Sequence, residues 1–231
     1  MISPKVFEIL KRKKQAIRLK YNSLDGCPES ALEFELLLQC AQADIPVKYW
    51  DYTLNDLNQA NIPIRDKLMK YCLNFDKVLN EGLGLFLVGA NGNGKTMSAC
   101  LILKEALRQN KTARFITLNQ IVAMASDGTY NADIRKAFEE QITQVDFLVI
   151  DDITKIYKNT QKTQSTYVDT QLDHVLRARC NLNLPTIITS NHSKEETFKS
   201  ADEVLTNSFL SLFQEHFTEI FFLGKDRRAD P

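Results

Sequence analysis

Short apolar runs alternate with helically spaced apolar residues along most of the chain. Buried strands are predicted at 85–88, 113–117, 145–152, 184–191 and 219–223. Between them, apolar residues recur every three or four positions, as in amphipathic helices. Such helices are predicted from about residue 95 and over 119–141, 166–180 and 201–216, with an interruption at Asp127-Gly128. The alternation predicts an α/β fold with about five parallel strands, right-handed crossovers and flanking helices.

The N-terminal part of the chain follows a different pattern. Residues 1 to about 22 favour a helix with seven cations and only Glu8 as an acid. This charge run is typical of contact with phosphates or an acidic partner, and equally of a solvated terminal helix. A more apolar helix begins at Glu29 or Ser30 and ends at Ile45-Pro46, because a proline disfavours helical conformation in the preceding residue. We therefore divide the chain into a helical N-terminal region, residues 1–75, and an α/β domain, residues 76–231.

Composition narrows the class of protein only a little. With 231 residues, 44% of them hydrophobic, the chain is expected to form a packed core. Lys and Arg together number 29, as do Asp and Glu, so net charge neither indicates nor excludes nucleic acid. The five cysteines form no C-x-x-C pair, which disfavours a disulfide framework or a cysteine zinc site. No apolar run is long enough to span a bilayer and no signal peptide is visible, so we expect a cytoplasmic protein without a membrane partner.

Residues 89–96 carry the clearest chemical motif. They fit G-x-x-x-x-G-K-[ST], the phosphate-binding loop of nucleoside triphosphatases, and lie between a predicted strand and a predicted helix. Its glycines allow successive N–H groups to turn inward around an anion, and the helix N-terminus adds free donors. We expect Lys95 to contact the β- and γ-phosphates of ATP. The residues predicted to bind nucleotide here are Gly89, Ala90, Asn91, Gly92, Asn93, Gly94, Lys95, Thr96 and Met97.

A second group of polar residues follows the predicted central strand. Asp151 and Asp152 stand at its C-terminal end, where open α/β sheets bind ligands. We expect Asp151 to hold Mg²⁺ together with the Thr96 hydroxyl, and Asp152 to orient or deprotonate the attacking water. Asn191, at the end of the next strand, either contacts the γ-phosphate or the water, or caps the following helix. The predicted catalytic residues are Asp152, Asn191 and Lys95, and the predicted cofactors are ATP and Mg²⁺.

This series of motifs resembles the AAA+ helicase loaders of the DnaC/DnaI type and their relative, the IstB transposition helper. The resemblance covers about residues 41–231. It rests on the 89–96 loop, the paired aspartates of 147–152, the P-T-I-I-T-S-N stretch ending at Asn191, and G-K-D-R-R at 224–228. It implies a P-loop AAA+ ATPase core over 76–231, preceded by a small helical region. A separate C-terminal lid is not expected, because the chain ends soon after Arg228.

The resemblance also implies roles for residues outside the loop. Asn191 corresponds to the sensor-1 residue, and Arg228 or Arg227 to an arginine that reaches the nucleotide. Arg179 matches an arginine that lies just before the sensor-1 strand, and it is expected to approach a neighbouring subunit's nucleotide.

One position departs from the family pattern. The family usually carries an arginine in an S-R-[LI] stretch before the last strand, where it acts on a neighbouring subunit, and here the matching residue is Leu212. Three consequences are open. Arg177 or Arg179 substitutes for the missing arginine, hydrolysis is slow, or assembly is templated by the helicase rather than by self-contact.

Family members assemble on single-stranded DNA into ATP-dependent spirals, and their N-terminal region grips the replicative hexameric helicase. The resemblance therefore implies an ATP-dependent DNA replication protein that loads this helicase onto single-stranded DNA, with residues 1–75 as the helicase-binding region. One alternative is an IstB-like transposition helper that binds duplex DNA. Another is an adaptor that binds ATP with little turnover. A small-molecule kinase is disfavoured, because the paired aspartates and the Thr-Ser-Asn strand end suit water activation.

Overall fold

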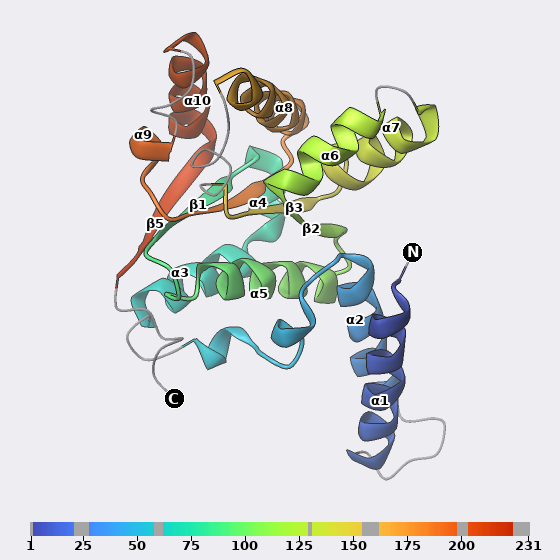
Figure 1. Cartoon of the computed structure of the whole chain (residues 1–231). Helices are drawn as coiled ribbons and strands as arrows, with labels where there is room; N and C mark the ends of the chain where they lie inside the picture. Colours follow the sequence, from blue (N-terminus) through green and yellow to red (C-terminus); the bar gives the residue numbers. More distant parts are fainter. Residues whose placement is uncertain are drawn as a thin grey trace.

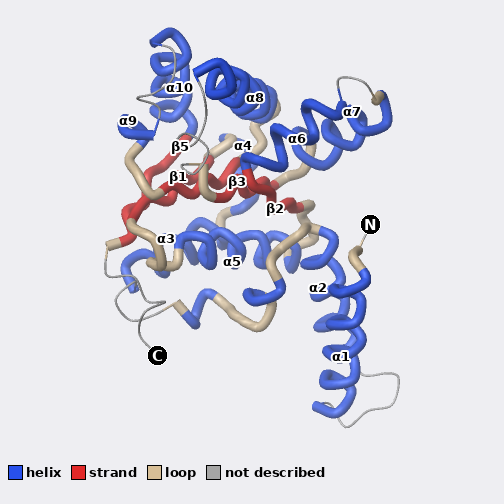
Figure 2. The backbone as a smooth tube through the Cα atoms, viewed as in Figure 1, coloured by secondary structure: helices blue, strands red, loops and turns tan. Residues whose placement is uncertain are grey.

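The computed structural model of the chain describes residues 2–20, 28–57, 62–128, 131–153, 162–197 and 203–223. Its strands are Gly84–Gly89 (β1), Ala113–Thr117 (β2), Phe147–Asp151 (β3), Thr186–Ser190 (β4) and Phe217–Phe222 (β5). Within the described ranges they form one parallel five-stranded sheet of order β2-β3-β4-β1-β5 (Figures 1 and 2). The predicted fold class and the parallel strands are confirmed.

Helices cover both faces of the sheet (Figure 1). One face is covered by Ile62–Leu73 (α3), Phe75–Glu81 (α4) and Lys95–Arg108 (α5). The other is covered by Leu118–Gly128 (α6), Ala132–Phe138 (α7), Lys162–Asn181 (α8) and Glu203–His216 (α10). A short helix, Lys194–Thr197 (α9), follows β4. This layering buries the strands on both faces, which explains their continuous apolar runs.

The N-terminal helices Pro4–Lys20 (α1) and Pro28–Gln42 (α2) lie side by side as a hairpin that extends away from the sheet (Figure 1). The basic helix expected at the N-terminus is therefore present as α1. The C-terminal part of α2 packs against α5, and two short 3₁₀ turns, Val47–Tyr49 and Leu54–Asp56, then lead to α3. Within the described ranges, no helix is long and apolar enough to cross a membrane.

Alternate residues of β1 enter two hydrophobic clusters, one on each face of the sheet. Leu85 and Leu87 join the cluster formed with α2, α3, α4 and α5, whereas Phe86 and Val88 join the cluster formed with α6, α8 and α10. Because the first cluster also contains Leu10 of α1, packing continues across residue 75. The nucleotide loop thus extends from a strand that is buried on both faces.

Some element boundaries differ from the sequence patterns. The helical segment before β1 breaks at Asn74, whose side-chain amide donates to the carbonyl of Lys70 at 2.7 Å, so that α3 and α4 are separate. The predicted interruption within 119–141 is confirmed as the gap between α6 and α7. A π-helical turn, Glu139–Thr143, then leads to β3, and there the Thr143 hydroxyl donates to the Glu139 carbonyl at 2.6 Å.

Candidate nucleotide-binding site

The loop of residues 89–96 connects β1 to α5 and rests on the end of β5. Gly92 and Gly94 have φ angles of 77° and 93°, which favour glycine. A Cβ at Gly89 would lie 2.4 Å from the carbonyl oxygen of Phe222, so only glycine allows the chain to pass there. Asn93 is buried, and its side-chain amide donates to the same carbonyl at 3.1 Å. The loop therefore packs directly against the C-terminal end of β5.

The ammonium group of Lys95 lies inside this loop. Its Nζ donates to the carbonyls of Gly89 at 2.6 Å and Ala90 at 2.8 Å, and to Oδ1 of Asn191 at 3.0 Å. The structure thus brings together the loop lysine and the polar residue after β4, as the order of parallel strands requires. A phosphate in the loop would give this ammonium group an oppositely charged acceptor in place of neutral carbonyls.

Thr96 and Asp151 also meet, and Thr189 joins them. The hydroxyls of Thr96 and Thr189 donate to Oδ1 of Asp151 at 2.8 and 2.7 Å. The backbone N–H of Asp152 in turn donates to the Thr189 hydroxyl at 2.8 Å. Asp152 has a φ angle of 54°, an uncommon value for a residue with a side chain. The Thr189 hydroxyl therefore contacts the side chain of Asp151 and the backbone of Asp152.

The sequence analysis assigned no role of its own to Thr189, which belongs to the Thr-Ser-Asn strand end. Its position gave one usable indication, since it lies on β4 two residues before Asn191 and its side chain faces the same side of the strand. Strand β4 pairs with β3, which ends at Asp151. A polar residue at that register could therefore have been expected beside the aspartates.

The oxygen donors in this site fit Mg²⁺. Hydroxyl and carboxylate oxygens, as on Thr96 and Asp151, are ligands that this hard cation prefers. Among the residues that the structure describes, no group of three or more His, Cys, Asp or Glu side chains could hold a metal. In nucleotide sites Mg²⁺ is usually held by one or two protein oxygens, with the remaining ligands from phosphate and water.

The structure contradicts the expected role of Arg179. The side chain is fully buried, so it cannot approach the nucleotide of a neighbouring subunit. Its guanidinium donates within the fold, and burial lowers its pKa below that of an ordinary arginine. The acceptors are the carbonyls of Ile142, Val145, Asp146 and Pro185 and the hydroxyl of Thr186. Arg179 therefore fastens the turn before β3 to the start of β4.

The remaining arginines and Leu212 have different surroundings. Arg177, on α8, is about half exposed, and it contacts Asp173 at 2.8 Å and Ser208 of α10. Leu212 is 6% exposed and packs in the cluster that contains Phe213, so its side chain belongs to the core. Arg227 and Arg228 lie outside the described residues. Of the arginines proposed to act on a neighbouring subunit, only Arg177 is at the surface in the described part of the chain.

Comparison with known proteins places this site in a family. The model of the IstB-like ATP binding protein family matches residues 43–226. The crystal structure of the DnaC helicase loader is similar, with a TM-score of 0.64 and 19% identity over 77% of this chain and 100% of that one. The structure of DnaI gives 0.61 and 20% over 80% and 94%. DnaA bound to AMPPCP and single-stranded DNA gives 0.58 and 17% over 76% and 50%. At these identities the structures show the shared AAA+ fold, and no curated protein sequence matches.

Proposed function

The chain belongs to the IstB-like ATP-binding protein family, and from that premise we propose that it is a Mg²⁺-dependent ATPase that loads a replicative hexameric helicase onto single-stranded DNA. The observation that carries the ATPase proposal is the convergence of Lys95, Asn191 and Asp151 at the end of β1, β3 and β4. These residues come from three separate motifs, and their contacts form a single polar site.

Each side chain has a role in this proposal. Lys95 holds the β- and γ-phosphates, and Thr96 and Asp151 hold the metal ion. Bound Mg²⁺ would neutralise charge on the phosphates as the γ-phosphoryl group leaves. Asp152 orients the attacking water or accepts its proton, and Asn191 senses the γ-phosphate. Arg227 or Arg228 completes the nucleotide contacts.

The loading proposal is supported by the shared fold with the DnaC helicase loader and with DnaI. The α1–α2 hairpin extends away from the ATPase core (Figure 1). Helix α1 carries exposed cations such as Lys5 and Arg12. We infer that residues 1–75 bind the helicase and that the protein assembles on single-stranded DNA in the presence of ATP. An IstB-like helper would instead bind duplex DNA tightly, with steep salt dependence.

A second candidate, an ATP-binding adaptor with little turnover, follows from the arginines. Arg179 is buried and the residue at the expected finger position, Leu212, faces the core. Of the two arginines considered for this role, Arg177 is the one with an exposed side chain, at 49%. If Arg177 does not act in this way, hydrolysis remains slow, because such an arginine accounts for about 10³–10⁵ in rate in related enzymes.

A loading assay tests the proposal. The replicative helicase of the source organism would unwind a short strand annealed to a closed single-stranded circle, onto which a preformed ring cannot thread. We expect this protein with ATP to stimulate unwinding, and Lys95→Ala to abolish the stimulation. Lys77→Ala, an exposed lysine on α4, is the matched control. Unwinding that is unaffected by the protein would reject the loading proposal.

A further inference from the structure

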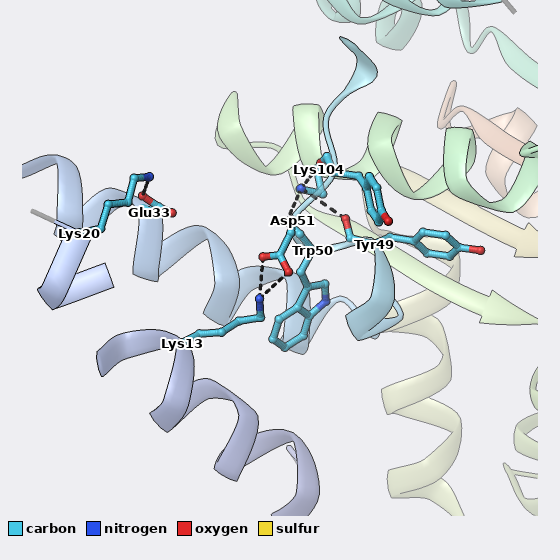
Figure 3. Close-up of polar contacts among 8 residues, drawn as sticks. Lys13, Lys20, Glu33, Tyr49, Trp50, Asp51 and Lys104 are labelled. Atoms are coloured by element: carbon cyan, nitrogen blue, oxygen red, sulfur yellow. Dashed lines mark hydrogen bonds and ion pairs between the residues drawn. The ribbon is translucent and has the colours of Figure 1, made fainter. Parts of the chain in front are cut away.

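We propose that Lys104 is the positioning residue that fixes the α1–α2 hairpin to the phosphate-binding helix α5. Its ammonium group donates to backbone carbonyls of residues 49–52, and Asp51 of this segment pairs with Lys13 of α1 (Figure 3). The inference rests on the proposed function only where it assigns the hairpin to helicase binding. The structural part concerns the attachment itself, and it can be tested without a helicase.

Lys104 is a buried charge held by backbone carbonyls. Lys104 lies on α5 and is 2% exposed. Its Nζ donates to the carbonyls of Trp50 at 2.5 Å, of Tyr52, and of Tyr49 at 3.4 Å. Burial lowers the pKa of this ammonium group. Taking a charge out of water is costly unless its hydrogen bonds are made, so segment 49–52 must stay where its carbonyls converge on Lys104. One side chain of α5 thereby holds this segment at three of its carbonyls.

Asp51 lies within the same segment and points the other way. Figure 3 shows Lys104 approaching the segment from α5 and Lys13 approaching Asp51 from α1. The Lys13 Nζ lies 2.6 and 2.7 Å from the two carboxylate oxygens of Asp51. Trp50, between them, is buried and its indole N–H donates to the Ile45 carbonyl at 2.8 Å. The segment is therefore a rigid link between the two helices.

The hairpin needs such a link because its contact with the core is incomplete. A groove of about 800 Å³ opens between α1, α2 and α5, lined by side chains that include Ile17, Leu36 and Leu107. Farther along the hairpin, Lys20 of α1 pairs with Glu33 of α2 at 2.9 Å, which ties the two helices to each other rather than to the core. The C-terminal end of α2 is held to the core separately, since Arg114 donates to the Gln42 carbonyl at 3.0 Å and pairs with Asp44 at 2.6 Å. Loss of the Lys104 attachment would therefore release mainly α1.

The attachment lies on the helix that begins at the nucleotide site. Lys104 is nine residues after Lys95, or roughly 14 Å along the axis of α5. The same helix that offers Lys95 and Thr96 to the phosphates therefore carries the hairpin at its other end. Whatever binds the hairpin is held at a fixed position relative to the nucleotide.

Hydrogen–deuterium exchange of the full chain, followed by mass spectrometry, tests the attachment. We expect Lys104→Met to accelerate exchange about tenfold in residues 47–57 and in α1, because an undocked helix frays. The strands and the 89–96 loop should exchange as in the wild type, and ATP affinity should not change. Lys77→Met on α4 replaces an exposed lysine in the same way and should leave all rates unaltered.

Asp51→Asn and Lys13→Gln break only the outer contact and lie at the surface, so both are expected to fold. They should accelerate exchange in α1 while leaving residues 47–57 protected. Wild-type rates in α1 for all three variants would overturn the proposal. Acceleration spread evenly over the whole chain in Lys104→Met, with no change in the two surface variants, would also overturn it, because Lys104 would then be a general stabiliser.

Helicase capture separates this inference from the proposed function. If the wild type captures the helicase, Lys104→Met should weaken capture in parallel with its exchange change. If the wild type captures no helicase, the loading proposal fails while the exchange result still decides the attachment. Capture that is equal in wild type and Lys104→Met, despite a released α1, would reject the role of the attachment in partner binding.

Discussion

Lys95 and Lys104 are buried lysines on the same helix, and they allow the nucleotide site to be compared with the hairpin attachment. Both ammonium groups donate to backbone carbonyls. Around Lys95 the carbonyls belong to a glycine-rich loop at the open end of the sheet, where phosphate can replace them. Around Lys104 they belong to a segment anchored by buried Trp50. We propose that similar contacts serve ligand exchange in one place and permanent attachment in the other.

Arg179, like Lys104, is a buried cation that donates to backbone carbonyls. Its replacement is expected to have the largest effect on stability. Arg179→Met leaves several buried acceptors without their donor, so the free energy of unfolding should fall by roughly 3–5 kcal/mol. Urea unfolding followed by circular dichroism measures the change. A variant of wild-type stability that has lost DNA-stimulated hydrolysis would restore the role on a neighbouring subunit and place Arg179 with Lys95 instead.

Lys95→Ala should affect binding and leave folding nearly intact. Removing the charge from the phosphates is expected to weaken ATP binding about 100-fold, since hydrogen bonds to charged groups contribute about 1.5–3 kcal/mol. Titration with a fluorescent ATP analogue measures the affinity, and urea unfolding measures stability. The comparison would fail if Lys95→Ala were as destabilising as Lys104→Met.

Thr189→Val tests whether the Thr189 hydroxyl positions Asp151 for the metal ion. Because valine cannot donate to Asp151 or accept from Asp152, the Mg²⁺ concentration needed for half-maximal ATP binding should rise about tenfold. Thr189→Ser keeps the hydroxyl and should restore the wild-type value. ATP binding measured in EDTA is the control and should be the same for all three proteins. Equal metal dependence in the valine variant would show that Thr189 has no part in positioning Asp151.

The smallest effect is expected at the outer contact of the hairpin. Asp51 is 74% exposed on its side chain, so the Lys13–Asp51 pair should contribute no more than about 1 kcal/mol to stability. Asp51→Asn should therefore shift the unfolding midpoint slightly at low salt and hardly at all at 0.5 M salt. A large shift that is insensitive to salt would mean that Asp51 holds the hairpin in some way other than charge.

The two lysines also show what could be predicted from the sequence. Lys95, Thr96, Asp151 and Asp152 lie in contiguous motifs next to apolar strand runs, and that local pattern is enough to place them at one edge of a parallel sheet. The strand order then brings Asn191 to the same edge. The sheet, most helices and the core of the site were predictable for this reason.

Lys104 and Arg179 could not be predicted in the same way. Each looks like an ordinary basic residue on an amphipathic helix, and its acceptors lie outside that helix. The carbonyls around Lys104 lie about fifty residues earlier in the chain, and those around Arg179 come from the turn before β3 and the start of β4. Resemblance assigned Arg179 to a neighbouring subunit, and only the packing shows that it is enclosed. Every residue has a backbone carbonyl, so the sequence does not indicate which carbonyls accept from a buried cation.

ATP hydrolysis by the full chain is the most direct test of the proposed ATPase. It is measured in Mg²⁺ with the chain alone, with single-stranded DNA, and with DNA plus the helicase. The account predicts a rate above that of Lys95→Ala in every condition, rising with DNA and helicase, and loss of that rate in Asp152→Asn. A rate equal to Lys95→Ala in all three conditions would contradict it, because residues 89–96 and 151–152 would then not form a working ATPase site.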